Sequence, residues 1–137
     1  MNFTWKRALL FAVLFLSFVV LPVGLASTGM MEYYQARIDQ NPDTPFHQWL
    51  QMAMADVCYR TMRPEMAAGY YRRFWERYPK DERRPVAYLR YALALADSGR
   101  NADAVAAFQK YMDDYPDRED RKVAAAGIER IRFVDAR

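Results

Sequence analysis

Hydrophobic and polar residues follow two different patterns along the chain. Residues 8–26 read ALLFAVLFLSFVVLPVGLA without a single charge, whereas from residue 45 onward apolar residues recur every three or four positions between charged ones. The second pattern is typical of amphipathic helices. Prolines and Gly99 interrupt it, because proline cannot continue a helix and glycine favours a left-handed helix end. The pattern predicts five helices, at about residues 45–61, 63–78, 83–98, 101–115 and 117–133.

The uncharged N-terminal segment predicts a helix that crosses a membrane. At a rise of about 1.5 Å per residue it would extend about 28 Å, close to the thickness of a bilayer core. Lys6 and Arg7 precede the segment, and no basic residue follows it before Arg37. This asymmetry predicts a cytoplasmic N-terminus and a periplasmic domain. We therefore expect a single-pass protein of the cytoplasmic (inner) membrane that contacts the lipid bilayer through residues 8–26.

The same segment also fits a cleavable signal peptide, with a basic start, an apolar stretch and the small residues Gly24 and Ala26 at its end. Cleavage after Ala26 would release a secreted periplasmic protein. The apolar run is longer than the usual signal-peptide core of about 7–15 residues, which favours an uncleaved anchor. The expected division is a signal-anchor helix over residues 1–26, a linker over 27–45 and a helical domain over 46–135.

The helical part contains an internal repeat. The string AAGYYRRFWERYPKDERR from Ala67 aligns with AVAAFQKYMDDYPDREDR from Ala104, at an offset of 37 residues. Small residues recur where two helices must approach closely, and bulky ones such as Tyr71 and Phe108 recur where the groove between helices must be filled. The sequence thus predicts an all-α fold of two helical hairpins and a final helix.

These repeats resemble the tetratricopeptide repeat family, which places small and aromatic residues on two helices and then a proline. The second unit matches at Tyr88, Tyr91, Ala92, Leu95, Gly99, Ala104, Phe108 and Pro116. The first unit departs from the family at Met62, which replaces the turn glycine. The pattern F-x-x-x-Y-P before a charged loop resembles repeats of bacterial envelope proteins of the outer-membrane assembly and cell-division coordinating types. The resemblance, over residues 47–133, implies a short α-hairpin solenoid that binds proteins.

Charge and composition argue against nucleic-acid binding and catalysis. The net charge is +3, and Lys6 and Arg7 contribute two of these, which leaves +1 for the rest. A nucleic-acid-binding domain would keep a basic excess. The chain has one cysteine, Cys58, one histidine, His47, and no phosphate loop, CxxC or GxSxG motif. We expect no enzyme and no catalytic, metal or cofactor site. An enzyme subunit that carries a cofactor is the disfavoured alternative.

The aromatic and basic stretch between Tyr70 and Tyr78 is the candidate docking surface. Tyr71, Phe74 and Tyr78 share one helical face and are expected in the core. The other aromatic and basic residues are of the types that dominate interface energetics, and we expect the partner to be bound by Tyr70, Arg72, Arg73, Trp75 and Arg77. The alternative is that Tyr70 and Trp75 pack against neighbouring helices.

Two hairpins lie near the lower limit for a solenoid, because each repeat is stabilised by its neighbours. A partner that covered the exposed end of the stack would supply the missing contacts. The sequence therefore predicts a membrane-anchored scaffold or accessory subunit within a larger membrane protein complex, with membrane or periplasmic proteins as partners and no nucleic acid. The alternative is a cleaved, secreted periplasmic protein of envelope assembly.

Overall fold

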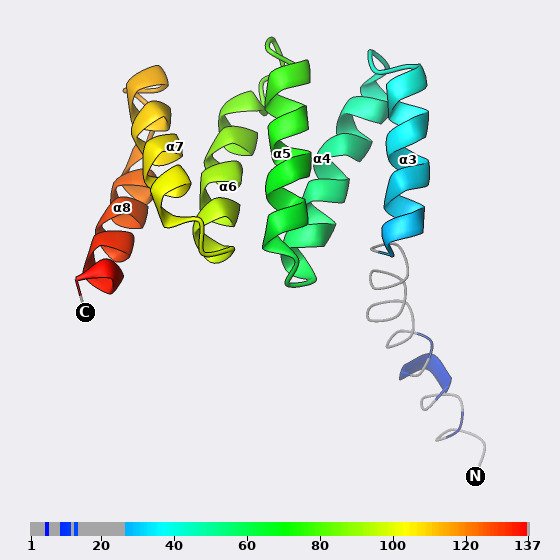
Figure 1. The fold of residues 1–137 in the computed structure, drawn as a ribbon. Coiled ribbons are helices and arrows are strands. Elements are labelled where there is room, and N and C mark those ends of the chain that lie inside the picture. Colours follow the sequence, from blue (N-terminus) through cyan, green and yellow to red (C-terminus); the bar gives the residue numbers. More distant parts are fainter. Residues whose placement is uncertain (1–4, 6–8, 12, 14–26, 137) are drawn as a thin grey trace.

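Residues 5, 9–11, 13 and 27–136 are described by the structure, a computed structural model of the chain. In this part of the chain the helices are α3 (Thr28–Gln40), α4 (Pro45–Arg60), α5 (Pro64–Arg77), α6 (Arg84–Asp97), α7 (Asn101–Asp114) and α8 (Arg121–Asp135). They stand side by side in one row, with α3 at one end and α7 and α8 at the other (Figure 1). The all-α solenoid that the repeat predicts is thus the architecture of the described residues.

The two hairpins, α4 with α5 and α6 with α7, end their first helices in the same way. The backbone N–H of Arg63 donates to the carbonyl of Cys58 at 3.0 Å. The equivalent bond, 37 residues later, joins the N–H of Arg100 to the carbonyl of Leu95 at 3.0 Å. This bond closes a Schellman motif, which satisfies carbonyl groups that the end of a helix leaves without partners. The repeat seen in the sequence is therefore a repeat of backbone geometry as well.

The second helices of the hairpins bury side chains at the same spacing. Buried positions i, i+4 and i+7 are occupied by Ala67, Tyr71 and Phe74 in α5 and by Ala104, Phe108 and Tyr111 in α7. The small residue lets the paired helices approach, and the two aromatic rings fill the space between them. These rings form the centre of a core that continues through all the described helices.

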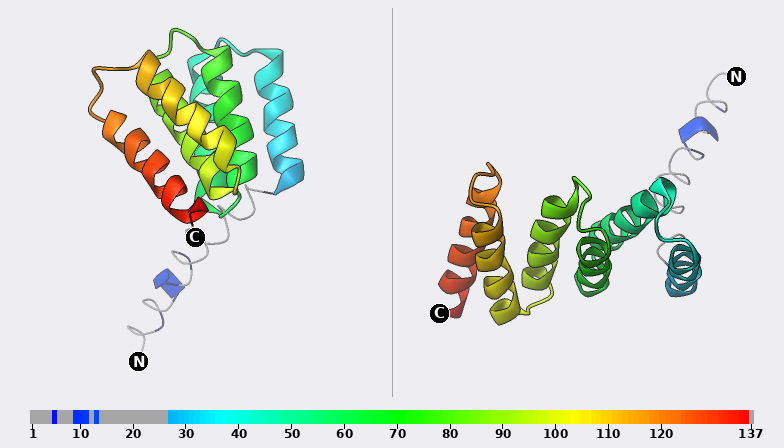
Figure 2. Two further views of the ribbon diagram at one scale, coloured as in Figure 1. Left: turned by 60° about the vertical axis from the view of Figure 1, so that its left-hand side comes forward. Right: turned by 90° about the horizontal axis from the view of Figure 1, so that it is seen from above.

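Helix α3 occupies most of the stretch that the sequence predicted as a linker. It buries Met31, Gln35 and Ile38, again at i, i+4 and i+7. By this spacing α3 corresponds to α5 and α7, the second helices of their hairpins. Viewed from above, α3 stands at the open end of the row beside α4 (Figure 2). Among the described residues, no helix precedes α3 in the way that α4 precedes α5.

None of the described helices is long and apolar enough to cross a membrane. The longest, α4, has 16 residues, or about 24 Å, and carries Asp56 and Arg60. This finding contradicts the predicted N-terminal transmembrane helix and the single-pass inner-membrane location, with a periplasmic domain, that depended on it. Most of residues 8–26, where lipid contact and the alternative cleavage after Ala26 were predicted, lies outside the described residues.

The predicted helix boundaries hold closely for α4 to α7, whereas α8 begins at Arg121 rather than near Asp117. Residues 115–120 form turns instead of a first helical turn. Asp120 accepts hydrogen bonds from the hydroxyl of Tyr111 and from the guanidinium of Arg118. These bonds hold the loop against α7, so the helix starts only after Asp120.

Candidate functional site

The candidate site is built around α4, whose start is fixed by its first residues. The side-chain oxygen of Thr44 accepts a hydrogen bond from the backbone N–H of His47 at 3.2 Å, and Pro45 occupies the first turn of the helix. Both features favour a helix start at this point. The helix then turns Ala55 and Cys58 into the core, where both are fully buried. Its opposite face lines two grooves.

The first groove lies between α4 and α6 and is called here the α4/α6 groove. It encloses about 450 Å³. Its floor is apolar and its rim is charged, and it is lined by Trp49, Met52, Ala53, Asp56, Val57, Arg60, Arg83, Val86 and Arg90. Apolar floors with a few charged groups are typical of sites that bind ligands and protein segments.

Asp56 is the carboxylate of the α4/α6 groove, and it is already engaged. It accepts hydrogen bonds from the guanidinium of Arg90 at 2.6 Å and from the hydroxyl of Tyr71 at 2.6 Å. Burial, and then the bond to Asp56, raises the pKa of Tyr71. These contacts join α4, α5 and α6, so they fix the width of the groove.

The arginines give the α4/α6 groove a positive character. The guanidinium of Arg83 donates two bonds to Asp81, from Nε at 2.9 Å and from Nη2 at 2.7 Å. The bonds from Arg83 hold the pKa of the Asp81 carboxyl below its usual value. Arg60 is exposed and has no ion-pair partner among the residues described. Among the arginines of this groove, Arg60 is therefore the one that a bound carboxylate would pair with most directly.

The second groove lies between α3 and α4 and is called here the α3/α4 groove. It encloses about 260 Å³ and has no charged residue in its lining, which consists of Met31, Tyr34, Phe46, Trp49, Leu50, Ala53, Met54 and Val57. Phe46 and Trp49 are 62% and 55% exposed, and their rings stack with centroids 6.0 Å apart. Large aromatic side chains left open in this way mark interaction sites.

The two grooves are continuous across α4. Trp49, Ala53 and Val57 line both of them. A bound segment that reached across this ridge would therefore contact an apolar surface on one side and arginines on the other.

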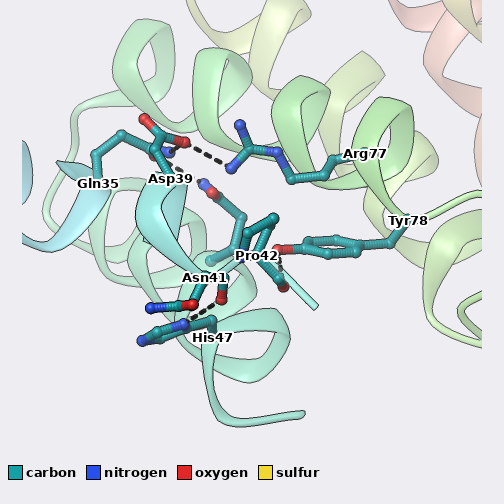
Figure 3. A network of polar contacts seen from close by, with 8 residues as sticks. Gln35, Asp39, Asn41, Pro42, His47, Arg77 and Tyr78 are labelled. Carbon is teal, nitrogen blue, oxygen red and sulfur yellow. Dashed lines mark hydrogen bonds and ion pairs between the residues drawn. The ribbon is translucent and has the colours of Figure 1, made fainter. Parts of the chain in front are cut away.

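A polar network ties the C-terminal end of α3 to neighbouring elements (Figure 3). Asp39 accepts hydrogen bonds from Arg77 of α5 at 2.6 Å and from Gln35 at 3.0 Å. The hydroxyl of Tyr78 donates to the carbonyl of Pro42 at 2.9 Å. These contacts attach the C-terminal end of α3 to the end of α5, while the buried bond from Gln51 to Gln35 at 3.2 Å joins α3 to α4.

The five docking residues predicted from the sequence all lie on α5, but they differ in burial and in the residues they contact. Tyr70 is buried and Trp75 is half-buried, with the Trp75 ring edge-on to Tyr88 at 4.8 Å between centroids. Arg73 lies over the ring of Tyr70 at 5.5 Å, and these two residues share a shallow hollow with Met66.

The other two predicted docking residues make ion pairs within the chain. Arg77 pairs with Asp39 of α3 at 2.6 Å, and Arg72 pairs with Glu76 at 3.9 Å on the surface. The structure therefore brings Tyr70 and Arg73 together, and both Arg73 and Arg77 lie near Asp39 of α3. A role for these five residues in binding a partner stays a prediction.

Sequence reasoning missed the residues that line the two grooves. Phe46 and Trp49 lie three positions apart on one predicted helix, a spacing that places both rings on the same face. Their exposure, however, depends on the place of α3, which the sequence did not predict as a packed helix. The arginines Arg60, Arg83 and Arg90 come together only when α4 and α6 stand side by side.

Within the described part of the chain, no group of three histidine, cysteine, aspartate or glutamate residues could hold a metal ion. Cys58 is fully buried, and this burial raises the pKa of its thiol. A buried thiol of raised pKa is a packing residue rather than a nucleophile.

Comparison with known families identifies one repeat. Residues 86–118, which contain most of α6, all of α7 and the turn after it, match the family model of the tetratricopeptide repeat. No curated protein sequence matches the chain. Tetratricopeptide repeats are non-catalytic scaffolds for contacts between proteins, so the match supports this family and a role in protein–protein interaction. The match names no subtype, and the resemblance to bacterial envelope proteins stays a prediction.

Proposed function

We propose that this protein is a scaffold that acts as an accessory subunit of a larger protein assembly, and that it holds a partner protein in the α4/α6 groove. The observation that supports this proposal is the groove itself, in which an apolar floor with Trp49 and Val86 faces the charged rim of Arg60 and Arg90. Tryptophan and arginine contribute most to protein interfaces when they are desolvated. The match to a tetratricopeptide repeat agrees with such a role.

The contacts around the groove favour a preformed binding site over one that folds on binding. Asp56 joins Arg90 and Tyr71 at 2.6 Å each, and the guanidinium of Arg83 is fixed by two bonds to Asp81. A site that is already ordered loses little conformational entropy when it binds. We therefore expect the partner to bind without large movement of α4 and α6.

The proposal is tested by purifying the tagged full-length chain from its native cells and quantifying the proteins that accompany it. We compare Arg60→Glu with Lys122→Glu, because both reverse one exposed charge and Lys122 lies on α8, away from the groove. We expect Arg60→Glu to reduce recovery of the partner by about tenfold or more. Lys122→Glu should leave recovery unchanged. Equal recovery with all three proteins, or no stoichiometric partner at all, would contradict the proposal.

A further inference from the structure

We propose that the α3/α4 groove receives an amphipathic helix of the partner protein, with an apolar face and acidic flanks. The helix would take the place of the first helix of a hairpin whose second helix is α3. This inference rests on the proposed scaffold function and specifies the chemistry of the partner.

The repeat geometry shows that the α3/α4 groove is a place built for a helix. At the offset of 37 residues, Trp49 and Ala53 of α4 correspond to Val86 and Arg90 of α6. Val86 and Arg90 line the groove on the side that faces the preceding first helix, α4. Trp49 and Ala53 therefore face the place where a first helix before α3 would lie. Among the described residues nothing fills that place, and the groove remains open there.

The lining of the groove predicts the apolar face of its ligand. Phe46 and Trp49 stack on each other and remain more than half exposed, while Leu50, Ala53 and Val57 continue the surface along α4. An aromatic ring buries about 150–250 Å² when it is fully covered, so these two rings alone leave roughly 200 Å² to be covered. Residues at i, i+3, i+4 and i+7 of an amphipathic helix would cover such a groove.

Charge on both sides of the groove predicts the acidic flanks. On one side, across Trp49, lie Arg60, Arg83 and Arg90. On the other side a hollow that shares Phe46 with the groove is lined by Arg37. Asp56 is the one carboxylate in the linings of these three cavities and already binds Arg90, and Asp81 already binds Arg83, so Arg37 and Arg60 carry the charge that remains to be complemented. Glutamate or aspartate beside the apolar face of a bound helix would complement the excess of arginine.

Charge also argues against two other occupants of the α3/α4 groove, a second copy of the chain and its own apolar segment. A second copy of the chain on the same surface would bring the arginines of both grooves together, and like charges at an interface oppose binding. The apolar segment 8–26 of this chain has no acidic residue, so it would leave Arg37 and Arg60 without partners. A partner helix with acidic flanks satisfies both the apolar groove and its rim.

The test measures the binding of fluorescently labelled synthetic helices to the full-length protein. The probe is an 18-residue peptide with leucine at i, i+3, i+4 and i+7 and glutamate beside the leucine face. One control has the same composition in scrambled order, and a second has lysine in place of glutamate. We expect the first peptide to bind at least tenfold more tightly than either control, and its affinity to fall as salt screens the arginines.

A matched pair of variants locates the binding site. Phe46→Ala removes an exposed ring from the groove, and Phe133→Ala removes an equally exposed ring from α8, since the two are 62% and 63% exposed. We expect Phe46→Ala to weaken binding of the glutamate peptide by about tenfold. Phe133→Ala should not change it. Circular dichroism of both variants checks that the helices are retained.

Three outcomes would overturn the inference. Equal binding of the scrambled or lysine peptide would show that neither the apolar face nor the acidic flanks are recognised. Binding that Arg60→Glu abolishes and Phe46→Ala leaves intact would place the peptide in the α4/α6 groove alone, which keeps the proposed function and removes this inference. A dimer of the chain that dissociates in Phe46→Ala, without binding of any peptide, would make a second copy the occupant.

Discussion

Met62 carries the strained backbone of the first hairpin turn. It has φ 58°, and Gly99 has φ 78° at the equivalent place in the second hairpin. Residues with a Cβ adopt this left-handed region at a cost of about 1–2 kcal/mol, whereas glycine adopts it freely. The Met62 side chain is 87% exposed, so it contributes little packing in return. The sequence already indicated this position, because methionine there replaces the glycine of the repeat.

We predict that Met62→Gly raises the free energy of unfolding by roughly 0.5–1 kcal/mol, since the relief of strain exceeds the greater freedom of glycine in the unfolded chain. The complementary change, Gly99→Ala, should lower the free energy of unfolding by about 1 kcal/mol. Urea unfolding followed by circular dichroism measures both values. A loss of stability in Met62→Gly would show that the methionine side chain makes a contact that matters.

Asp81 forms an ion pair with Arg83, which lines the α4/α6 groove. Its side chain is 11% exposed and accepts three bonds from Arg83, two from the guanidinium and one from the backbone N–H, which lower the pKa of the carboxyl. A carboxyl whose pKa is lower in the folded state stabilises the fold above its unfolded pKa, near 4, and loses this contribution as the pH falls further. The ion pair also holds Arg83 at the rim of the groove.

We predict that Asp81→Asn lowers the free energy of unfolding by about 1–2 kcal/mol at pH 7, because Arg83 loses a charged acceptor. The difference from the unmodified protein should shrink as the pH falls below 4, where the carboxyl is itself increasingly protonated. Thermal unfolding at pH 7 and at pH 3 checks this. A difference that is equal at both values would mean that the charge of Asp81 is not what stabilises the fold.

At the scale of the helix, close packing of α8 against α7 depends on Gly127. A Cβ added to Gly127 would lie 2.6 Å from ring atoms of Phe108, which is fully buried. The ring cannot move away without disturbing the core, because buried side chains are already close-packed. Gly69 of α5 offers the opposite case, since a Cβ there meets nothing within 4 Å.

We predict that Gly127→Ala lowers the free energy of unfolding by roughly 1–3 kcal/mol through overpacking. Gly69→Ala should instead raise it by up to about 1 kcal/mol, because alanine favours a helix and fits the open space. The pair is measured by chemical denaturation under one condition. Similar effects of the two substitutions would indicate that α8 shifts on α7 without cost.

The sequence predicted α4 to α7 well because their ends are marked by local signals. Thr44 and Pro45 start α4, and Gly99 ends the turn after α6. Helix α3 was not predicted as a packed helix because its buried face is not purely apolar. Gln35 lies between Met31 and Ile38, and it accepts a hydrogen bond from the buried side chain of Gln51 at 3.2 Å. A buried polar pair between two helices cannot be recognised from hydrophobic spacing alone.

At the scale of the whole molecule, the candidate site is assembled from helices that are distant in the sequence. Tyr34 of α3 and Trp49 of α4 border one groove, and Val86 of α6 borders the other. The sequence drew attention to the aromatic and basic stretch of α5, where the residues are adjacent along the chain. In the folded chain part of that stretch packs against neighbouring helices, and the open aromatic and basic residues lie around α4 instead.

At the scale of the whole molecule, the surface around α4 is expected to hold a partner protein across both grooves. Photo-cross-linking in native cells tests it most directly, with a photoreactive amino acid placed in the full-length chain at Phe46, at Arg60 or, as a control, at Lys122. We predict that the same partner protein is cross-linked from Phe46 and from Arg60 and is absent at Lys122. Cross-links of equal yield at Lys122, or none from the two groove positions, would contradict the claim.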